Sequence, residues 1–378
     1  MNHLITLYHL IFIVKIKNIM TVCILGNSLT ALTLAKALVN KNIYVEILAK
    51  KKDIKLGLTR TLGISKSNSN FLNKSVINIE KLLWKLKKIE IFTDNLQKEK
   101  LINFENIEDH LFSIIKNYEL YEILKNDLSK NKYFKKKQYN NKNLFFIKNY
   151  SLIINCDYSH FITKKYFSKK IIKKYDSFAY TTIIEHEKIL NDTAIQIFTK
   201  KGPLAFLPIS NNETSVVYSV HNSSLEKNYK IEELINRYNF KYKIKNIKKV
   251  DSFELQSLNL RSYYHNNILA FGDLLHRVHP LAGQGFNMTI RDIKNLINII
   301  IKKNELGLPI DSSICDEFED IVKHKNLIFS GGVNLIHEFF NLERKSNSKI
   351  LSKSIQYLGK NSSANRIFTK IADKGILF

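Results

Sequence analysis

Cysteine is scarce in this chain. Cys23, Cys156 and Cys315 are the only three among 378 residues, and no two of them form a C-x-x-C pair. An odd number of widely separated cysteines argues against a disulfide framework, and the missing C-x-x-C spacing argues against a structural zinc site. Such usage is typical of a reducing compartment, so we expect a cytoplasmic protein.

Long hydrophobic runs are also missing. Residues 4–14 are apolar, but no basic segment precedes them and no small-residue cleavage site follows them, unlike in a secretory signal. The stretch is too short for a membrane-spanning helix, which needs roughly 20 apolar residues. Met20 stands directly before the first strand-like run. We therefore expect residues 1–19 to be an extension that is disordered or not translated, with a membrane-surface anchor as the alternative.

Acidic residues are few beside basic ones, 34 against 59, which leaves a formal net charge of +25. A basic surface attracts nucleic acids and anionic lipids. The lysines are spread along the whole chain, however, and the dense runs at 135–143 and 162–175 contain no nucleic-acid-binding motif. We interpret most lysines as solvated and expect no nucleic-acid partner. The 44% of hydrophobic residues is typical of a folded globular protein.

Glycine and proline number only 12 and 4, yet three glycines and one proline fall within residues 271–288, FGDLLHRVHPLAGQGFNM. Residues 267–271 read as a buried strand, and the apolar spacing from 286 to 301 predicts a helix. The segment between them is therefore a loop that presents Asp273 at the end of a strand and free N–H groups at the start of a helix. These groups can hold a polyhydroxylated chain and stabilise a developing anion.

A second strand-loop-helix unit opens the folded part of the chain. Residues 22–25 and 43–48 predict strands, with a helix between them, which is the arrangement that places a helix N-terminus against a dinucleotide pyrophosphate. Its G-x-G-x-x-G fingerprint is degenerate, because Gly26 is followed by Ser28 and Ala31. A left-handed backbone at Ser28 would cost about 1 to 2 kcal/mol. Ala49 stands where an acidic ribose ligand is usual, so a structural unit without nucleotide stays an alternative.

The motif at 272–296 resembles that of the class A flavoprotein monooxygenases, and among them the ubiquinone-biosynthesis hydroxylases. The matching positions are Gly272, Asp273, His276, Pro280, Gly283, Gln284, Gly285, Asn287 and Asp292. Segments 60–65, 117–124 and 202–220 are similar to further parts of the same family. The resemblance implies an α/β fold like that of para-hydroxybenzoate hydroxylase, in which a Rossmann-like FAD-binding domain carries an inserted, mostly antiparallel β-sheet substrate domain and a helical C-terminal tail.

This resemblance also implies a domain division. We expect a discontinuous FAD-binding domain at 20–165 and 257–330, with part of 66–100 on the substrate side. The substrate domain would occupy 166–256, and 331–378 would form a lysine-rich, amphipathic helical segment. Such a segment could bring the protein to the surface of the inner membrane.

The implied activity is hydroxylation of an aromatic ring. FAD, reduced by NADH or NADPH, would react with O2 to give a flavin hydroperoxide, which attacks a polyprenylated phenol of ubiquinone biosynthesis. Because the cofactor carries the chemistry, no Ser-His-Asp set, paired carboxylates or metal cluster is needed. The alternatives are a catalytically silent flavin-binding subunit of a biosynthetic complex, a reductase or halogenase on the same fold, and a basic protein that merely retains it. Other ubiquinone-biosynthesis proteins are expected partners.

The resemblance also indicates which residues would hold FAD. They are Gly26, Ser28, Ala31, Arg60, Asp157, Gly272, Asp273, Pro280, Gly283, Gln284, Gly285, Phe286 and Asn287. The backbone of Pro280, Gly283 and Gly285 would lie near the flavin ring, and no catalytic side chain is assigned. Tyr158 follows Asp157 where the family has glycine, which places the route of the nicotinamide in doubt. Loop histidines such as His276 and His279 are more often structural than catalytic.

Overall fold

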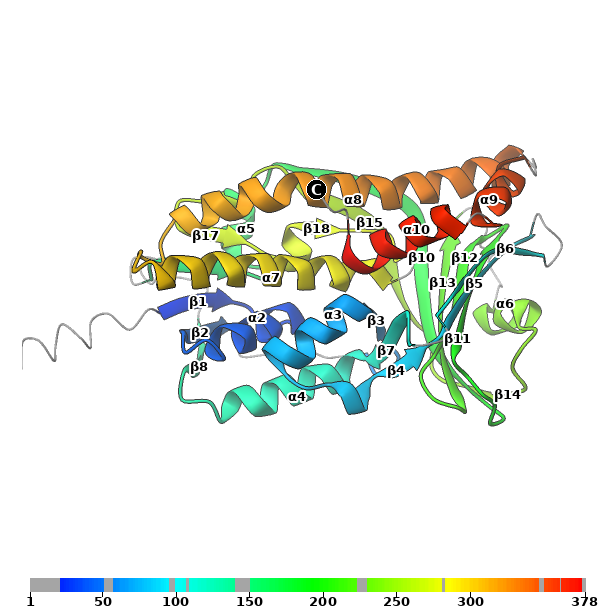
Figure 1. Ribbon diagram of the computed structural model, residues 1–378, viewed down its shortest axis with the longest axis horizontal. Coiled ribbons are helices and arrows are strands. Elements are labelled where there is room, and N and C mark those ends of the chain that lie inside the picture. The colour runs from blue at the N-terminus through cyan, green and yellow to red at the C-terminus, as the bar shows by residue number, and fades with distance from the viewer. Residues whose placement is uncertain are drawn as a thin grey trace, which may run out of the picture.

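The structure is a computed structural model that describes residues 21–50, 57–94, 99–106, 109–139, 150–222, 230–280, 283–346, 350–360 and 362–375. The expected extension at 1–19 and part of the lysine run at 135–143 lie outside these residues. Figure 1 shows a parallel sheet with helices on one side of the molecule and a large antiparallel sheet on the other.

The parallel sheet has the strand order β16-β17-β9-β1-β2-β8, and its pairs are parallel except β16 with β17. Its strands are β1 (Thr21–Leu25), β2 (Tyr44–Ala49), β8 (Phe134–Gln138), β9 (Leu152–Asn155), β16 (Tyr264–His265) and β17 (Ile268–Ala270). The inner strands are buried along nearly their whole length, and so they read as continuous apolar runs. Because β1 lies between β9 and β2, the strand order reverses direction at β1, and in open sheets of this kind ligands bind outside the carboxyl ends of the strands. We call this edge, at the carboxyl ends of β1, β9 and β17, the crevice.

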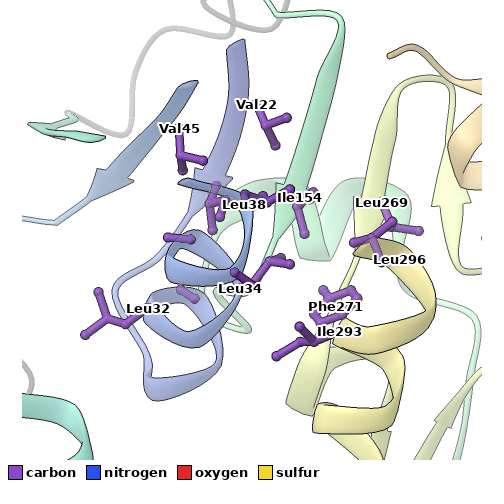
Figure 2. Close-up of a cluster of buried hydrophobic side chains, with 14 of the residues drawn as sticks. Val22, Leu32, Leu34, Leu38, Val45, Ile154, Leu269, Phe271, Ile293 and Leu296 are labelled. Carbon is purple, nitrogen blue, oxygen red and sulfur yellow. The ribbon is translucent and has the colours of Figure 1, made fainter. Parts of the chain in front are cut away.

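Helices cover this sheet and complete the main core. They are α2 (Leu29–Val39), α4 (Asn117–Ser129), α5 (Phe161–Tyr166), α7 (Gln284–Glu305) and α8 (Ser313–Ser346). Figure 2 shows Leu34 and Leu38 of α2 in one cluster with Val22 of β1 and Ile154 of β9, while Ile293 of α7 lies beside Phe271. Fully burying a side chain of this size contributes about 1.5–3 kcal/mol, so this core is what fixes the ends of the strands in place.

The large sheet has the strand order β18-β15-β10-β13-β12-β11-β5-β6, and β14 pairs with β10. Its strands are β5 (Lys88–Thr93), β6 (Lys100–Glu105), β10 (Lys170–His186), β11 (Thr193–Thr199), β12 (Gly202–Pro208), β13 (Glu213–His221), β14 (Ile244–Ile247), β15 (Asp251–Leu260) and β18 (His276–Arg277). All pairs are antiparallel except β5 with β11. Helix α6 (Ile231–Tyr238) packs its apolar residues against one face.

A small sheet connects these two parts. It contains β3 (Thr61–Ser65), β7 (Phe112–Lys116) and β4 (Trp84–Leu86) in the order β3-β7-β4, and α3 (Lys66–Phe71) follows β3 directly. Gly63 in β3 packs so closely on its neighbour that a Cβ atom there would lie 2.2 Å from the Phe112 ring. Because Gly63 has no side chain, the Phe112 ring lies directly on the backbone of β3.

The C-terminal region is helical, but its first helix begins at Ser313 and not at 331. Helices α9 (Ile350–Lys360) and α10 (Ser362–Lys374) follow α8. Helix α10 returns to the small sheet, where the backbone N–H of Ser67 donates to the Asp373 carboxylate at 2.8 Å. No helix in the described ranges is both long and apolar enough to cross a membrane.

The fold expected from the sequence is confirmed: an α/β protein with a parallel sheet, an antiparallel sheet and a helical C-terminal region. The domain boundaries stay a prediction. Strands β5, β6 and β18, which lie outside 166–256 in the sequence, also pair into the large sheet.

Candidate cofactor site

Glycines bring the ends of three strands together at the crevice. Gly26 follows β1 with φ of +98°, and a Cβ atom there would lie 3.1 Å from the Asp157 Cβ, just beyond β9. Gly272 follows β17 with φ of +66°, and its Cβ would lie 2.7 Å from Thr30 Cγ2 in the first turn of α2. Both backbones lie in the left-handed region that favours glycine. The turn that carries Asp273 is therefore held directly against the N-terminus of α2.

Helix α2 begins with a serine where the fingerprint expects glycine. Ser28 has φ of −64° and ψ of 166°, and its hydroxyl accepts a hydrogen bond from the N–H of Ala31 at 3.3 Å. The backbone is extended, so the left-handed strain considered for Ser28 does not arise. The hydroxyl satisfies one donor of the first turn, while the other early N–H groups of a helix have no intrahelical acceptor. Ala31 is fully buried, as close packing of helix and strand requires.

Asp273 is exposed at this edge. Its backbone carbonyl accepts from Arg277 Nε at 3.1 Å, while no hydrogen bond within the described residues involves its carboxylate. Arg60, also exposed, stands at the start of β3. Two side chains that the sequence assigned to the cofactor are thus available to a ligand.

The loop before α7 approaches β3 closely. Gly283 has φ of +63°, and a Cβ atom on it would lie 3.3 Å from both the Cα and the N of Gly63. The Gly283 N–H donates a hydrogen bond to the Pro280 carbonyl, with 3.4 Å between nitrogen and oxygen. A Cβ at Gly285 would meet only Val278 Cγ2, at 4.0 Å, so the space beside Gly285 is open. The first turn of α7 is therefore accessible to a ligand from one side.

Asn287 fixes this loop to the small sheet. Its Nδ2 donates to the carbonyls of Gly63 and Gly283 at 2.9 and 3.1 Å, and its Oδ1 accepts from the N–H of Ser65 at 2.9 Å and from Asn68 Nδ2 at 2.8 Å. These bonds occupy the amide, which gives Asn287 a positioning role. Gln284 is nearly buried in the same turn, and the half-buried Phe286 packs against the main core.

His276 has a structural partner. Its Nε2 lies 2.6 Å from Asp292 Oδ2, and both side chains are almost completely buried. Asn326 of α8 donates to both Asp292 oxygens at 3.1 and 3.2 Å. The three side chains join the loop, α7 and α8. The histidine and the aspartate of the motif are thus used for folding, and no proton relay through His276 is required.

Asp157 turns the chain after β9. Its Oδ1 accepts from the N–H of Ser159 at 2.8 Å and from the Ser159 hydroxyl at 2.7 Å, and Lys50 Nζ donates to that hydroxyl at 2.8 Å. The carboxylate is therefore committed to its own turn, while the Cβ and backbone of Asp157 face Gly26.

Tyr158 is held between two cations at this turn. The Arg277 guanidinium lies 4.2 Å from the ring centroid, and Lys170 Nζ donates to the hydroxyl at 2.8 Å. This hydrogen bond from Lys170 lowers the pKa of the tyrosine. The ring thus occupies the surface beside Asp157 and engages both positive charges.

A pocket lies between the large sheet and α8. Its lining comprises Thr93, Asp94, Ser177, Phe198, Thr199, Lys200, Lys201, Gly202, Pro203, Ser219, His221, His279, His337, Phe340, Asn341 and Glu343. Among them, the sequence interpretation named His279 individually, while Gly202, Pro203 and Ser219 lie in the segment 202–220 that it identified by resemblance. One signal was present, because the scarcity of glycine and proline that marked 271–288 also marks the pair Gly202-Pro203.

The residues at the crevice fit a dinucleotide such as FAD. The first turn of α2 lies against the turn that carries the exposed Asp273 carboxylate, and Gly283 and Gly285 keep side chains away from the start of α7. Helix N-termini stabilise phosphates and other anions. Among the described residues, no three His, Cys, Asp or Glu side chains are placed to share a metal ion.

Comparisons with known proteins agree with this geometry. Residues 167–304 match the FAD binding domain family. Over 162 residues the chain is 26% identical to a ubiquinone hydroxylase of Rhodospirillum rubrum, a match that covers 41% of this chain and 38% of that protein. It is 24% identical over 164 residues to the 3-demethoxyubiquinol 3-hydroxylase of Escherichia coli, with 42% of each chain covered. The match thus spans about two fifths of the length of these curated relatives.

Solved structures share the whole fold at low identity. The p-nitrophenol 4-monooxygenase of Pseudomonas putida superposes with a TM-score of 0.76 at 11% identity, covering 94% of this chain and 100% of that one. HpxO of Klebsiella pneumoniae, solved with FAD and uric acid, gives 0.71 at 12% identity over 94% and 97% of the two chains. The expectation of FAD is confirmed by the family match. The chain therefore has the fold of the class A FAD-dependent monooxygenases, and the resemblance to their ubiquinone-biosynthesis branch is confirmed.

Proposed function

We propose that this protein is an FAD-dependent hydroxylase of an aromatic substrate. The observation that carries the proposal is the turn of Gly272 and Asp273, which is packed on the first turn of α2 and leaves its carboxylate exposed beside the crevice. A carboxylate at this position can accept hydrogen bonds from the hydroxyl groups of a ribityl chain. When bound, FAD would supply the redox chemistry with O2.

Each part of the crevice has a separate task in this proposal. The α2 N-terminus binds the pyrophosphate through its free N–H groups, with Arg60 as a further positive charge. The loop of Pro280, Gly283 and Gly285 presents N–H groups to the electron-rich edge of the flavin ring. A helix N-terminus stabilises such charge by about 0.3 to 2 kcal/mol, which favours the reduced cofactor. Asn287 holds this loop in position.

The substrate we propose is a polyprenylated phenol of ubiquinone biosynthesis, with NADH or NADPH as the reductant. Two curated relatives are named as a ubiquinone hydroxylase and a 3-demethoxyubiquinol 3-hydroxylase, which supports this class. The purified protein should oxidise NADH or NADPH faster when a prenylated phenol is added, and mass spectrometry should detect one added oxygen in the product. In cells without the protein, precursors lacking that oxygen should accumulate. Normal ubiquinone levels in such cells would contradict the proposed pathway.

A catalytically silent flavin-binding subunit is the second candidate. The observation that favours it is Tyr158, whose ring and hydroxyl engage Arg277 and Lys170 beside Asp157. If this surface is where a nicotinamide cofactor must pass, the tyrosine obstructs it. In that case the protein would bind FAD but would oxidise neither NADH nor NADPH.

Replacing Tyr158 with glycine should strengthen NADPH binding about fivefold. The change frees the Arg277 guanidinium from a cation–π contact of the kind worth about 1 kcal/mol, and the freed cation can then bind a phosphate. Stopped-flow measurement of flavin reduction against NADPH concentration gives the affinity. Tyr158→Phe is the matched control, because it retains the ring over which Arg277 lies and releases only Lys170, so it should strengthen NADPH binding less than Tyr158→Gly does. Equal affinities for all three proteins would show that the ring does not obstruct the cofactor.

We further propose that the outer face of α8 binds an anionic membrane surface. This face is defined by Leu327, Ile328, Gly331, Gly332, Leu335, Ile336 and Leu342, whose large side chains are 47% to 71% exposed. A Cβ atom at either glycine would meet nothing within 4 Å, so the face is uncovered at its centre. Such an apolar face on a chain of charge +25 combines the two attractions that hold amphipathic helices to anionic lipid.

Basic strand residues lie beside this outer face. Ile171, near the start of β10, is half exposed. Lys173, two residues further along β10, pairs with Glu338 of α8 at 2.7 Å. The lysine-rich start of β10 thus borders the apolar face, which favours lipid headgroups of negative charge.

Leu335→Glu should weaken binding to vesicles that contain phosphatidylglycerol by about tenfold or more, because burial of a leucine contributes about 1.5–3 kcal/mol. Vesicle cosedimentation measures the loss. Leu190→Glu is the matched control, since Leu190 is 82% exposed but lies in the loop before β11. Equal binding of both variants and the wild-type chain would exclude the outer face of α8 as the lipid site.

A further inference from the structure

The pocket between the large sheet and α8 contains a histidine whose hydrogen-bonding groups are unused. His279 is 1% exposed, and within the described part of the chain neither of its ring nitrogens has a hydrogen-bond partner. Leaving a buried polar group without a hydrogen bond costs free energy, so each such group needs an explanation, for example a bound water, an ion, a ligand or a catalytic role. His276, three residues earlier, differs because its partner is Asp292.

Aromatic groups hold the His279 ring in place without forming hydrogen bonds to its nitrogens. The Tyr175 ring meets it edge-on, with the ring centroids 5.0 Å apart at 84°. The Tyr175 hydroxyl donates instead to Asn334 of α8. The His337 ring lies 4.5 Å from that of His279, centroid to centroid, at 33°. The orientation of His279 is thus determined by packing, while its nitrogens remain available.

His279 is in the neutral form, which can accept a hydrogen bond. Burial, and next the nearby His337, lowers the pKa of His279 well below its usual value. The ring is therefore neutral at neutral pH, with one nitrogen that can accept and one that can donate. A ligand hydroxyl that donates a hydrogen bond to this acceptor would give the buried ring nitrogen the partner that it lacks.

The remaining lining indicates a planar aromatic ligand. Phe198 of β11 and Phe340 of α8 stack on each other at the pocket, and Pro203 adds a further apolar surface. Through the peptide bond, His279 is joined to Pro280, which begins the loop at the proposed flavin site. His279 is thus the residue of this pocket that is nearest in sequence to that loop.

We propose that His279 is the hydrogen-bond acceptor for the phenolic hydroxyl of the substrate, in the pocket formed by β11, β12, β13 and α8. This inference rests on the proposed function, because it takes a phenol as the substrate class. It adds a binding residue to that function. It also predicts that the enzyme distinguishes a phenol from the corresponding methyl ether, which has no O–H group to donate a hydrogen bond.

Calorimetry with the flavin-loaded protein tests this with two probes, 2-prenylphenol and its methyl ether. The wild-type chain should bind the phenol at least about tenfold more tightly, because a site built for a hydroxyl leaves its acceptor unpaired with the ether. His279→Leu should bind both ligands within about twofold of each other. His279→Gln retains an acceptor oxygen and should restore part of the preference. Flavin content and thermal unfolding of each variant show whether it is folded.

Ring-nitrogen NMR of protein labelled at histidine gives a second readout on the wild-type chain, so the test does not depend on the folding of a variant. Addition of the phenol should shift the His279 signal, and addition of the ether should not. If the wild-type chain binds neither probe, the proposed substrate class fails, and this inference fails with it. If it binds the phenol but shows no preference, or if His279→Leu retains the preference, only the role of His279 is overturned.

Discussion

Asp273→Asn is expected to give a folded protein that binds FAD about 10- to 100-fold more weakly than the wild-type chain. The carboxylate is exposed and makes no hydrogen bond within the described residues, so its loss should leave the fold unchanged. A hydrogen bond to a charged group contributes about 1.5–3 kcal/mol, and each 1.4 kcal/mol corresponds to a tenfold change in affinity. The ratio of flavin to protein absorbance after gel filtration, followed by titration with FAD, measures the loss.

Asp320→Asn provides the control for this experiment. Asp320 is also exposed, but it lies on α8, remote in sequence from the turn that holds Asp273. This variant should retain its flavin. Full flavin occupancy in Asp273→Asn would contradict the assignment of Asp273 to the ribityl chain.

Asp292→Leu should reduce the free energy of unfolding by about 3–5 kcal/mol. The change leaves His276 buried without an acceptor and removes both contacts of Asn326, and breaking a buried pair from one side is strongly destabilising. Since domains are stable by only about 5–15 kcal/mol, this is a large share of the total. Because the pair holds the loop before α7, flavin should be lost at lower denaturant concentration. Denaturant unfolding followed by fluorescence measures both effects.

Glu338→Leu is the matched control, since it removes an acidic residue of α8 that pairs with Lys173 at the surface. Such exposed pairs contribute about 0–1 kcal/mol, and this variant should unfold almost like the wild-type chain. A loss below about 1 kcal/mol for Asp292→Leu would mean that the buried pair is not a structural connection. The double variant with His276→Leu should recover part of the stability, because it leaves no unpaired histidine.

Much of the flavin-side architecture was predictable, because it depends on local patterns. The apolar run at 22–25 and the helical spacing after residue 286 identify the first strand and the last helix of the crevice, which the structure gives as β1 and α7. Gly283 at the start of α7 has the left-handed backbone that glycine tolerates best. Patterns of this kind are visible in one sequence because each concerns residues near one another along the chain.

Features that depend on distant partners were not predictable. The sequence suggested a crowded, strained Ser28, whereas the structure shows an extended residue that caps α2. His276 and His279 look alike in the loop, and they differ only because Asp292 contacts the first and His337 lies beside the second. The helical tail was expected from 331, but the amphipathic pattern does not reveal that α8 begins at Ser313 and supplies one wall of a pocket.

Helix α8 has one further consequence, which concerns how the proposed prenylated substrate would reach the protein. Its inner side lines the pocket with His337 and Phe340, and its outer side exposes Leu335 and Leu342. These two sides are separated by no more than the width of a helix, about 10 Å. If the outer side rests on lipid, the reactive ring needs to leave the membrane by only this distance. Its prenyl tail could then remain in the bilayer throughout turnover, without a carrier protein.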